Sequence, residues 1–155
     1  MLTVTVESCG DRIVIHFAGR IDHASAEKFT GAFEKLRGTV CLNLRKVTYI
    51  SSYGVGLLIR KLSAISSEHK VEFAECSETM VDQFQMLQFS RYGKITSFQA
   101  RHVCARCNRM ELVLLTQRDL QIDREKSAVR SPAFPCVCGG QLAVDDSLEF
   151  MLDHV

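Results

Sequence analysis

Apolar and polar residues alternate along the start of the chain with a period of two, which is typical of strands that bury one side. Two such runs cover residues 2–8 and 12–18, and Gly10-Asp11 lies between them. A glycine followed by an aspartate between two alternating runs is a common signal of a hairpin turn. We therefore expect the chain to begin with two antiparallel strands.

Three later stretches carry apolar residues at intervals of three and four, which predicts helices that pack along one side. The first should span about four turns after Asp22, because its stripe continues that far and Gly38 suits a helix end. The second should run from about residue 53 to 67 after Ser51 and Ser52, whose hydroxyls can cap a helix. The inward residues expected for these two helices are Ala26, Phe29, Phe33 and Leu36, then Val55, Leu58, Ile59, Leu62 and Ile65.

Ser77 can cap a third helix in the same way. Its inward side is expected to hold Met80, Val81, Phe84 and Leu87. Apolar runs at residues 40–44, 71–74 and 94–99 predict strands between and after the helices. The resulting order, β-β-α-β-α-β-α-β, predicts a small α/β domain over residues 1–100, in which a mixed sheet packs with helices and most neighbouring strands are parallel.

The pattern changes after residue 100, where four of the seven cysteines form two close pairs, Cys104 with Cys107 and Cys136 with Cys138. Two close pairs can supply four thiolates to a tetrahedral zinc ion. Apolar runs at 110–115 and 141–144 follow the pairs, as in two knuckles that each lead into a strand. We therefore expect residues 101–155 to form a small zinc-ribbon β module, with the charged stretch 118–130 as a loop at its far end.

The second cysteine pair has one intervening residue instead of two, so His102 and His154 remain open as replacements for one thiolate. A site closed by four protein ligands has no position for a substrate, and the expected role of the zinc is structural. Residues 1–7 alternate like a strand and do not look like a secretion signal. The expected location is therefore cytoplasmic, where thiols stay reduced and metal ligation is favoured over disulfides.

Net charge adds a limit on function, because 19 basic and 18 acidic side chains leave the 155-residue chain at +1. That balance argues against a general nucleic-acid binder, and the apolar runs are too short to insert into a membrane. The sequence contains no phosphate-binding loop, nucleophile elbow or Rossmann glycine pattern. We identify no catalytic residue and expect a binding protein, not an enzyme.

The first 100 residues resemble a STAS domain, the family of anti-sigma-factor antagonists. The resemblance lies in three segments on the expected elements, FAGRID at 17–22, VCLNLRKV at 40–47 and ISSYGVGLL at 50–58. It implies a STAS-like fold and a protein that binds signalling partners, such as kinase-like anti-sigma factors. It also implies control by phosphorylation at the start of the second helix.

The resemblance can be carried to single residues by aligning on Gly54. The family's phosphate acceptor then falls on Tyr53, with Ser52 beside it, and Ser51 takes the usual acidic position. Asn43 stands where an aspartate is common, whereas Asp22 fits its family position. The resemblance therefore implies partner contacts near Asp22, and it leaves phosphorylation of Ser52 or Tyr53 open.

The second helix independently suggests a binding surface. Tyr53, Leu57, Arg60 and Ala64 follow one another at spacings of four, three and four, so they form a line beside the buried stripe. Tyrosine and arginine beside leucine are typical of interface anchors. We predict that this line, with Asp22 and Ser52, contacts the partner. The alternative is that Leu57 and Ala64 only widen the buried stripe.

The function expected from these features is that of a bacterial signalling adaptor with a structural zinc ribbon. One alternative is a transcription regulator that contacts nucleic acid through arginines of the ribbon segment. Acidic residues in the same segment offset these arginines, so nucleic acid is not the preferred partner. Another alternative is a thiol enzyme, which would need an exposed cysteine of low pKa. The sequence does not indicate an oligomeric state.

Overall fold

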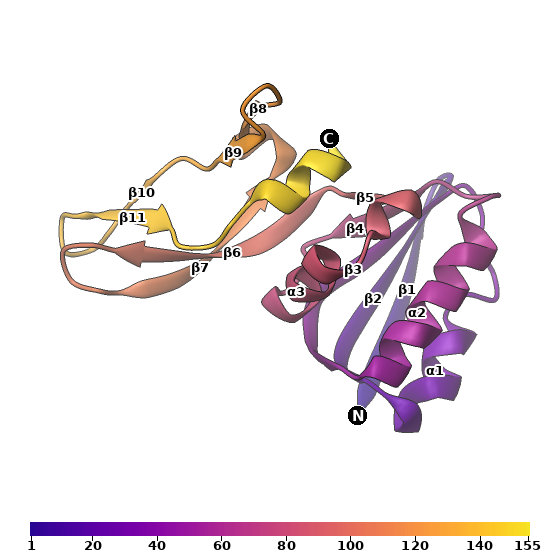
Figure 1. Ribbon diagram of the computed structural model, residues 1–155. Helices are drawn as coiled ribbons and strands as arrows, with labels where there is room; N and C mark the ends of the chain where they lie inside the picture. The colour runs from indigo at the N-terminus through magenta and orange to yellow at the C-terminus, as the bar shows by residue number, and fades with distance from the viewer.

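A five-stranded mixed sheet forms the first part of the molecule in the computed structural model, which describes residues 1–155. Its strands lie in sequence order; β1 pairs antiparallel with β2, and the other neighbours are parallel. The strands are β1 Leu2–Cys9, β2 Arg12–Ile21, β3 Thr39–Ile50, β4 Val71–Ala74 and β5 Lys94–Ile95. The opening hairpin and the predicted α/β class are confirmed (Figure 1).

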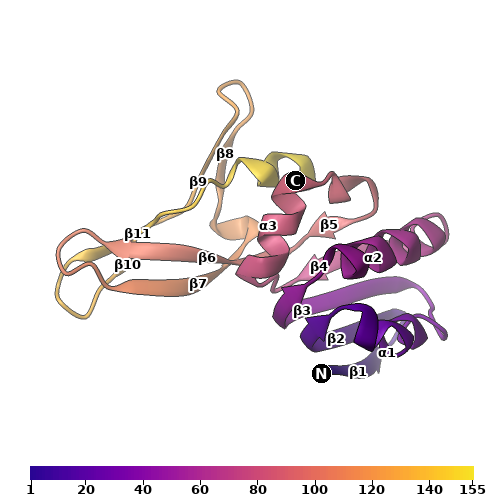
Figure 2. The same ribbon diagram turned by 60° about the horizontal axis from the view of Figure 1, so that its bottom comes forward.

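Three α-helices pack with this sheet, and α1 and α2 lie side by side in both views (Figures 1 and 2). Ile13, Ile15 and Phe17 on β2 are buried, and the residues between them are partly exposed, so only one face of β2 enters the core. The helical segments are η1 His23–Ser25, α1 Ala26–Gly31, α2 Ser52–Ile65, α3 Glu78–Met86 and η2 Phe89–Arg91.

A second, antiparallel sheet projects away from the first, at the left of Figure 1. Its strand order is β10-β11-β6-β7, and a separate hairpin, β8–β9, follows β7 in the chain. The strands are β6 Ser97–Cys104, β7 Met110–Thr116, β8 Gln121–Asp123, β9 Ala128–Arg130, β10 Phe134–Pro135 and β11 Gln141–Val144. Short turns η3 Gln117–Asp119 and η4 Glu149–His154 complete the chain.

The two sheets share one hydrophobic core. Phe98 and Leu115 of the second sheet are fully buried in the same cluster as the strands and helices of the first. Leu148 and Met151, at the C-terminal turn, belong to it as well. The boundary predicted at residue 100 falls inside β6, so one strand connects the two parts without a linker.

The predicted four-turn first helix is wrong in length. The segment starts as a 3-10 turn and continues as α1, which ends at Gly31. Thr30 and Gly31 are weak helix formers, which accounts for the early end. Phe33 nevertheless packs inward, from the turns that follow.

The predicted last strand, residues 94–99, is divided between the two sheets. β5 ends at Ile95, and the backbone N–H of Thr96 donates to the carbonyl of Phe73 at 2.8 Å. The hydroxyl of Ser97 then accepts the backbone N–H of Glu75 at 2.7 Å, where β6 begins. These contacts hold the point at which the chain leaves the first sheet.

Two smaller expectations are also wrong. Residues 118–130 are not a simple loop, because they contain the β8–β9 hairpin. Leu87 does not face inward; it is 38% exposed because α3 ends at Met86 and the backbone of Leu87 is extended.

Candidate functional site

The first turn of α2 sits directly against the end of β2. Ser51 caps the helix, since its hydroxyl accepts the backbone N–H of Gly54 at 3.0 Å, and its own N–H donates to the carbonyl of Ile21 at 3.0 Å. Gly54 is buried, and a β-carbon there would overlap the carbonyl oxygen of Ile21. A glycine is therefore needed at this contact, which fixes where the helix begins.

Asp22 organises the turn beside this helix start. Its carboxylate accepts the backbone N–H of Ser25 at 3.2 Å, and the Ser25 hydroxyl accepts the backbone N–H of Asp22 at 2.9 Å. The following residue, His23, lies with its ring stacked on that of Tyr53, 4.9 Å between centroids. Asp22 thus acts through the backbone, by holding the turn that places His23 against Tyr53.

The α2 surface is made of the exposed residues Ser52, Tyr53, Arg60 and Ala64, with Tyr53 44% exposed. Leu57 does not belong to it, because its side chain is only 5% exposed and forms part of the core. It lies one turn after buried Gly54 and next to buried Leu58, so it widens the buried stripe. The prediction that Leu57 reaches the surface is wrong, whereas Ala64 remains outside.

Sequence reasoning missed His23 and a second exposed pair near the same end of the sheet. Arg20 and Tyr49 are cross-strand neighbours on β2 and β3, and the guanidinium carbon of Arg20 lies 4.0 Å from the centre of the Tyr49 ring. Each residue looks ordinary in its own segment. Only the pairing of β2 with β3 makes the two visible as one feature.

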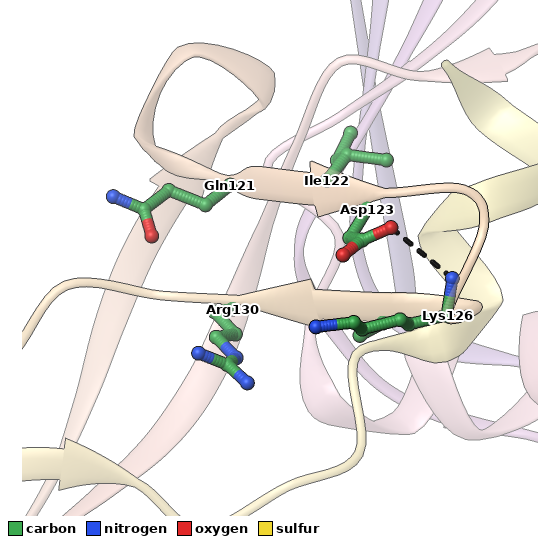
Figure 3. Close-up of a pocket in the computed structure, with 6 residues that line it drawn as sticks. Gln121, Ile122, Asp123, Lys126 and Arg130 are labelled. Atoms are coloured by element: carbon green, nitrogen blue, oxygen red, sulfur yellow. Dashed lines mark hydrogen bonds between the residues drawn. The ribbon is translucent and has the colours of Figure 1, made fainter.

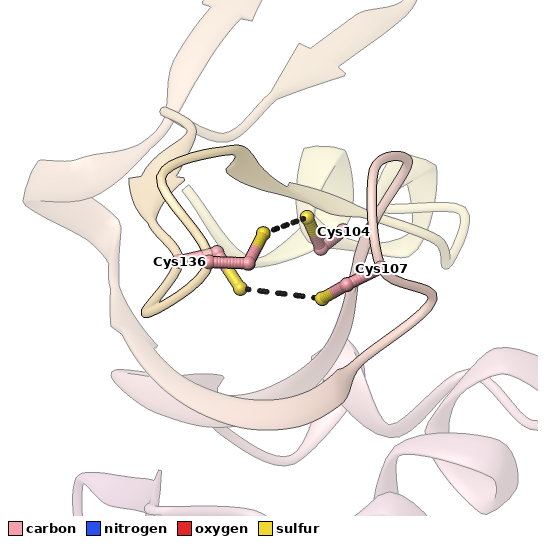
Figure 4. A group of neighbouring side chains, drawn as sticks. Cys104, Cys107 and Cys136 are labelled. Carbon is pink, nitrogen blue, oxygen red and sulfur yellow. Dashed lines mark hydrogen bonds between the residues drawn. The ribbon is translucent and has the colours of Figure 1, made fainter.

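The four C-terminal cysteines converge at the outer end of the second sheet (Figure 4). Their sulfur atoms all lie within 4.8 Å of one another, with 3.6 Å between Cys104 and Cys138 and 3.7 Å between Cys107 and Cys136. Cys104 ends β6 and Cys107 lies in the turn that follows, whereas Cys136 and Cys138 lie in the turn between β10 and β11. Four sulfur atoms at these separations suit a single tetrahedral metal ion.

Backbone amides face the sulfur atoms, as in a site built for thiolates. The N–H groups of Cys107 and Arg106 lower the pKa of the Cys104 thiol to about 6. The N–H of Gly140 also favours ionised Cys138, but desolvation and the other three sulfur atoms outweigh it and raise that pKa to about 12. Four adjacent thiolates repel one another without a cation, so the donor set fits a divalent metal such as zinc.

Neither histidine left open as a replacement ligand joins this cluster. His102 is buried and directs its ring nitrogens to the carbonyl of Ala100 at 3.0 Å and the hydroxyl of Ser131 at 3.4 Å. His154 lies in the core, where its Nδ1 accepts the backbone N–H of Ile95 at 3.1 Å. The group that could hold a metal ion therefore consists of the four cysteines alone.

Other hollows on the molecule are open to solvent. One of about 200 Å³ lies on the β8–β9 hairpin and is lined only by residues of that hairpin (Figure 3). Its one hydrogen bond to a side chain, from the backbone N–H of Lys126 to Asp123 at 3.1 Å, closes the turn between the two paired strands. We therefore assign it no function. No helix has the length and apolar character needed to cross a membrane.

Comparison with known proteins identifies the first part of the chain. The sequence model of a family described as "STAS domain" matches residues 3–101, more than half of the chain. No curated protein matches.

Among solved structures, a candidate anti-sigma factor antagonist from Thermotoga maritima is 17% identical, with a TM-score of 0.49 over 61% of this chain and 85% of its own. The anti-sigma factor antagonist SpoIIAA in its unphosphorylated form is 22% identical, with a TM-score of 0.45 over 60% of this chain and 87% of its own.

Proposed function

Because this chain belongs to the STAS domain family, we propose that it is a bacterial cytoplasmic signalling adaptor that binds a protein partner through the α2 surface. The single observation that carries the proposal is the build of that surface. A glycine contact and a capping serine fix the helix start. Exposed Tyr53 stacks on His23, and exposed Arg60 follows about two turns later along the same helix. Rigid, exposed aromatic and arginine side chains are common anchors of protein interfaces.

The kind of partner we propose is a kinase-like anti-sigma factor. The residues of the α2 surface can contact a partner through Tyr53 and Arg60, and His23 holds the Tyr53 ring in place. No group in this region is arranged as a nucleophile with a base. We therefore propose binding as the function of this surface, with no catalytic step.

The test is binding of the intact chain to purified kinase-like anti-sigma factors of the source organism, measured by titration calorimetry. Tyr53→Asp should weaken binding at least about tenfold, since it removes the anchor ring and adds a negative charge. Ser67→Asp, which adds the same charge at an exposed position beyond the other end of α2, is the matched control. Equal affinity of all three proteins would place the interface elsewhere.

We also propose that the α2 surface works without obligatory phosphorylation. The acceptor position holds Tyr53, and Ser51, at the usual acidic position, is engaged as the helix cap. Ser52 is exposed beside it, so a phosphate there would add negative charge to the α2 surface. Ser52→Ala should therefore leave affinity unchanged; a phosphorylated Ser52 in cell-derived protein that abolishes binding would contradict this.

The second part of the proposal is that Cys104, Cys107, Cys136 and Cys138 hold one structural zinc ion. The observation behind it is the convergence of four sulfur atoms with backbone amides directed at them. Bound zinc would supply a cross-link between the two turns. The chain's part is to hold the four thiolates at fixed separations, so no open position is left for a substrate.

Elemental analysis of the purified chain should give about one equivalent of zinc. Cys107→Ser should lose most of it, because three thiolates remain. Cys9→Ser is the matched control, since Cys9 is also an exposed cysteine but lies outside the cluster. A folded protein without metal, or full retention of zinc by Cys107→Ser, would refute the site.

A further inference from the structure

The second sheet has one open edge, and it is β7. The strand pairs with β6 on one side and with no strand on the other. The opposite edge of the sheet is β10, which has two residues, one of them Pro135. Proline has no N–H to donate to a further strand, so that edge does not readily pair with one; we call such an edge blunt. Any strand added to this sheet would therefore add to β7.

The register of β6 and β7 shows which backbone groups of β7 are free. The N–H of Cys104 donates to the carbonyl of Arg109 at 2.9 Å, and the antiparallel register continues without a break to Thr116. Because hydrogen-bonded pairs alternate, the N–H and C=O groups of Met110, Leu112 and Leu114 point away from β6. The free edge ends there, since the next outward N–H, that of Thr116, donates to Asp119 at 2.7 Å.

The side chains of these same three residues lie on one face of β7 and are exposed, Met110 by 51%, Leu112 by 44% and Leu114 by 37%. Natural edge strands usually carry charged residues, prolines or bulges that discourage pairing. The edge strand of the first sheet has a polar series of this kind, Thr3, Thr5 and Glu7. β7 lacks such protection over its first five residues, 110–114, where its one charge, Glu111, is paired with Arg109 at 2.7 Å.

We propose that β7 pairs with β7 of a second copy of this chain, antiparallel and about a two-fold axis at Leu112. The free edge is symmetric about that residue. Leu112 would face Leu112 of the second copy, and Met110 would face Leu114, so each outward N–H and C=O meets a partner. Every exposed apolar side chain also gains an apolar neighbour across the new pair.

Charge and closure favour a second copy over another occupant. Glu111 would face Val113 of the second copy, so like charges do not stand opposite each other, and each Glu111 keeps its Arg109. The two four-stranded sheets join into one continuous sheet whose outer edges are both β10. With both outer edges blunt, pairing stops at the dimer and does not continue into a filament.

The dimer is expected to be weak. Five residues of one strand from each chain bury far less than the roughly 800 Å² per partner of a standard interface. Association should therefore appear at concentrations in the micromolar range and above.

Sedimentation velocity of the full, metal-containing chain tests the proposal over about 5 to 500 µM. The sedimentation coefficient should rise from monomer toward dimer with concentration. Leu112→Lys should raise the dissociation constant at least about tenfold, because it places two like charges across the axis. Leu114→Lys is a second variant with the same expectation, should the first disturb the fold.

Val6→Lys is the matched control, because Val6 is 51% exposed on β1, the edge strand of the other sheet. It should associate like the original chain. Amide exchange gives an independent readout: the N–H groups of Leu112 and Leu114 should become protected as concentration rises. A chain that stays monomeric throughout, association unchanged in both lysine variants of β7, or association without protection of these amides would overturn the proposal.

Discussion

Gly54 carries the contact on which the position of α2 depends. The helix begins at the ends of two parallel strands, and the backbone of its first turn meets the carbonyl of Ile21. Gly56, two residues later in the same helix, has open space where a β-carbon would stand. The two glycines therefore have different reasons to be glycine, although both lie in one helical turn.

Gly54→Ala is expected to destabilise the protein by about 2 to 4 kcal/mol, since the new methyl group overlaps backbone that cannot move freely. Gly56→Ala should instead be neutral or stabilising by up to about 1 kcal/mol, because alanine has the better helix propensity. Urea denaturation monitored by circular dichroism measures both. Equal effects of the two substitutions would show that α2 does not rest on Ile21.

His154 is a titratable group in the core. Burial lowers its pKa to about 4, and nearby Lys94 acts in the same direction, against a smaller opposite effect of Asp153. The neutral ring accepts the backbone N–H of Ile95 through Nδ1. Protonation would remove that acceptor, so the docking of the C-terminal turn depends on a neutral histidine.

The free energy of unfolding should therefore decrease as the pH is lowered from about 6.5 to about 4. In that window the unfolded chain binds a proton at His154 that the folded chain does not, so acid favours unfolding. His154→Gln keeps an acceptor without titrating, and it should flatten this part of the profile by the order of 2 kcal/mol. Thermal denaturation of both proteins across the window provides the measurement; parallel profiles would contradict the role of His154.

The elements of the first sheet are predictable because each strand and helix has a strong local pattern. The path after Ile95 is not, since alternation continues from β5 into β6 and no local signal says which sheet a strand joins. The cysteine site is predictable from two close pairs. Leu57 is misjudged because it lies at the border of the buried stripe, where burial depends on how α2 rests on its neighbours.

Leu57 and Ala64 lie on the same helix, the first in the core and the second at the surface, so the same substitution should affect them differently. Leu57→Glu places a charge in the core and should cost more than about 3 kcal/mol of stability. Ala64→Glu, at an exposed position of the α2 surface, should change stability by less than about 0.5 kcal/mol. It should instead reduce affinity for the protein partner. Denaturation and binding titration of both variants separate the two effects; a stable Leu57→Glu protein would show that the residue is not in the core.

The molecule as a whole combines two sheets through one strand. β6 carries Phe98 in the shared core and ends at Cys104 in the cysteine cluster. The C-terminal turn returns to the same core, as Figure 2 shows beside α3 and β5. We nevertheless propose residues 1–100 as a domain, because the five-stranded sheet and its helices supply most of the buried cluster.

A chain that ends at Ala100 should fold cooperatively but with a melting temperature lower by about 10 °C or more, because it loses Leu115, Leu148 and Met151 from the core. A chain that ends at Asp145 is the matched control. It keeps the second sheet and all four cysteines, and it loses only the C-terminal turn.

If both truncated chains lose similar stability, the C-terminal turn accounts for the coupling between the two parts. If only the shorter chain is weakened, the second sheet accounts for it. Calorimetry of the three chains distinguishes these outcomes, and a shorter chain without any cooperative transition would show that residues 1–100 are not a domain.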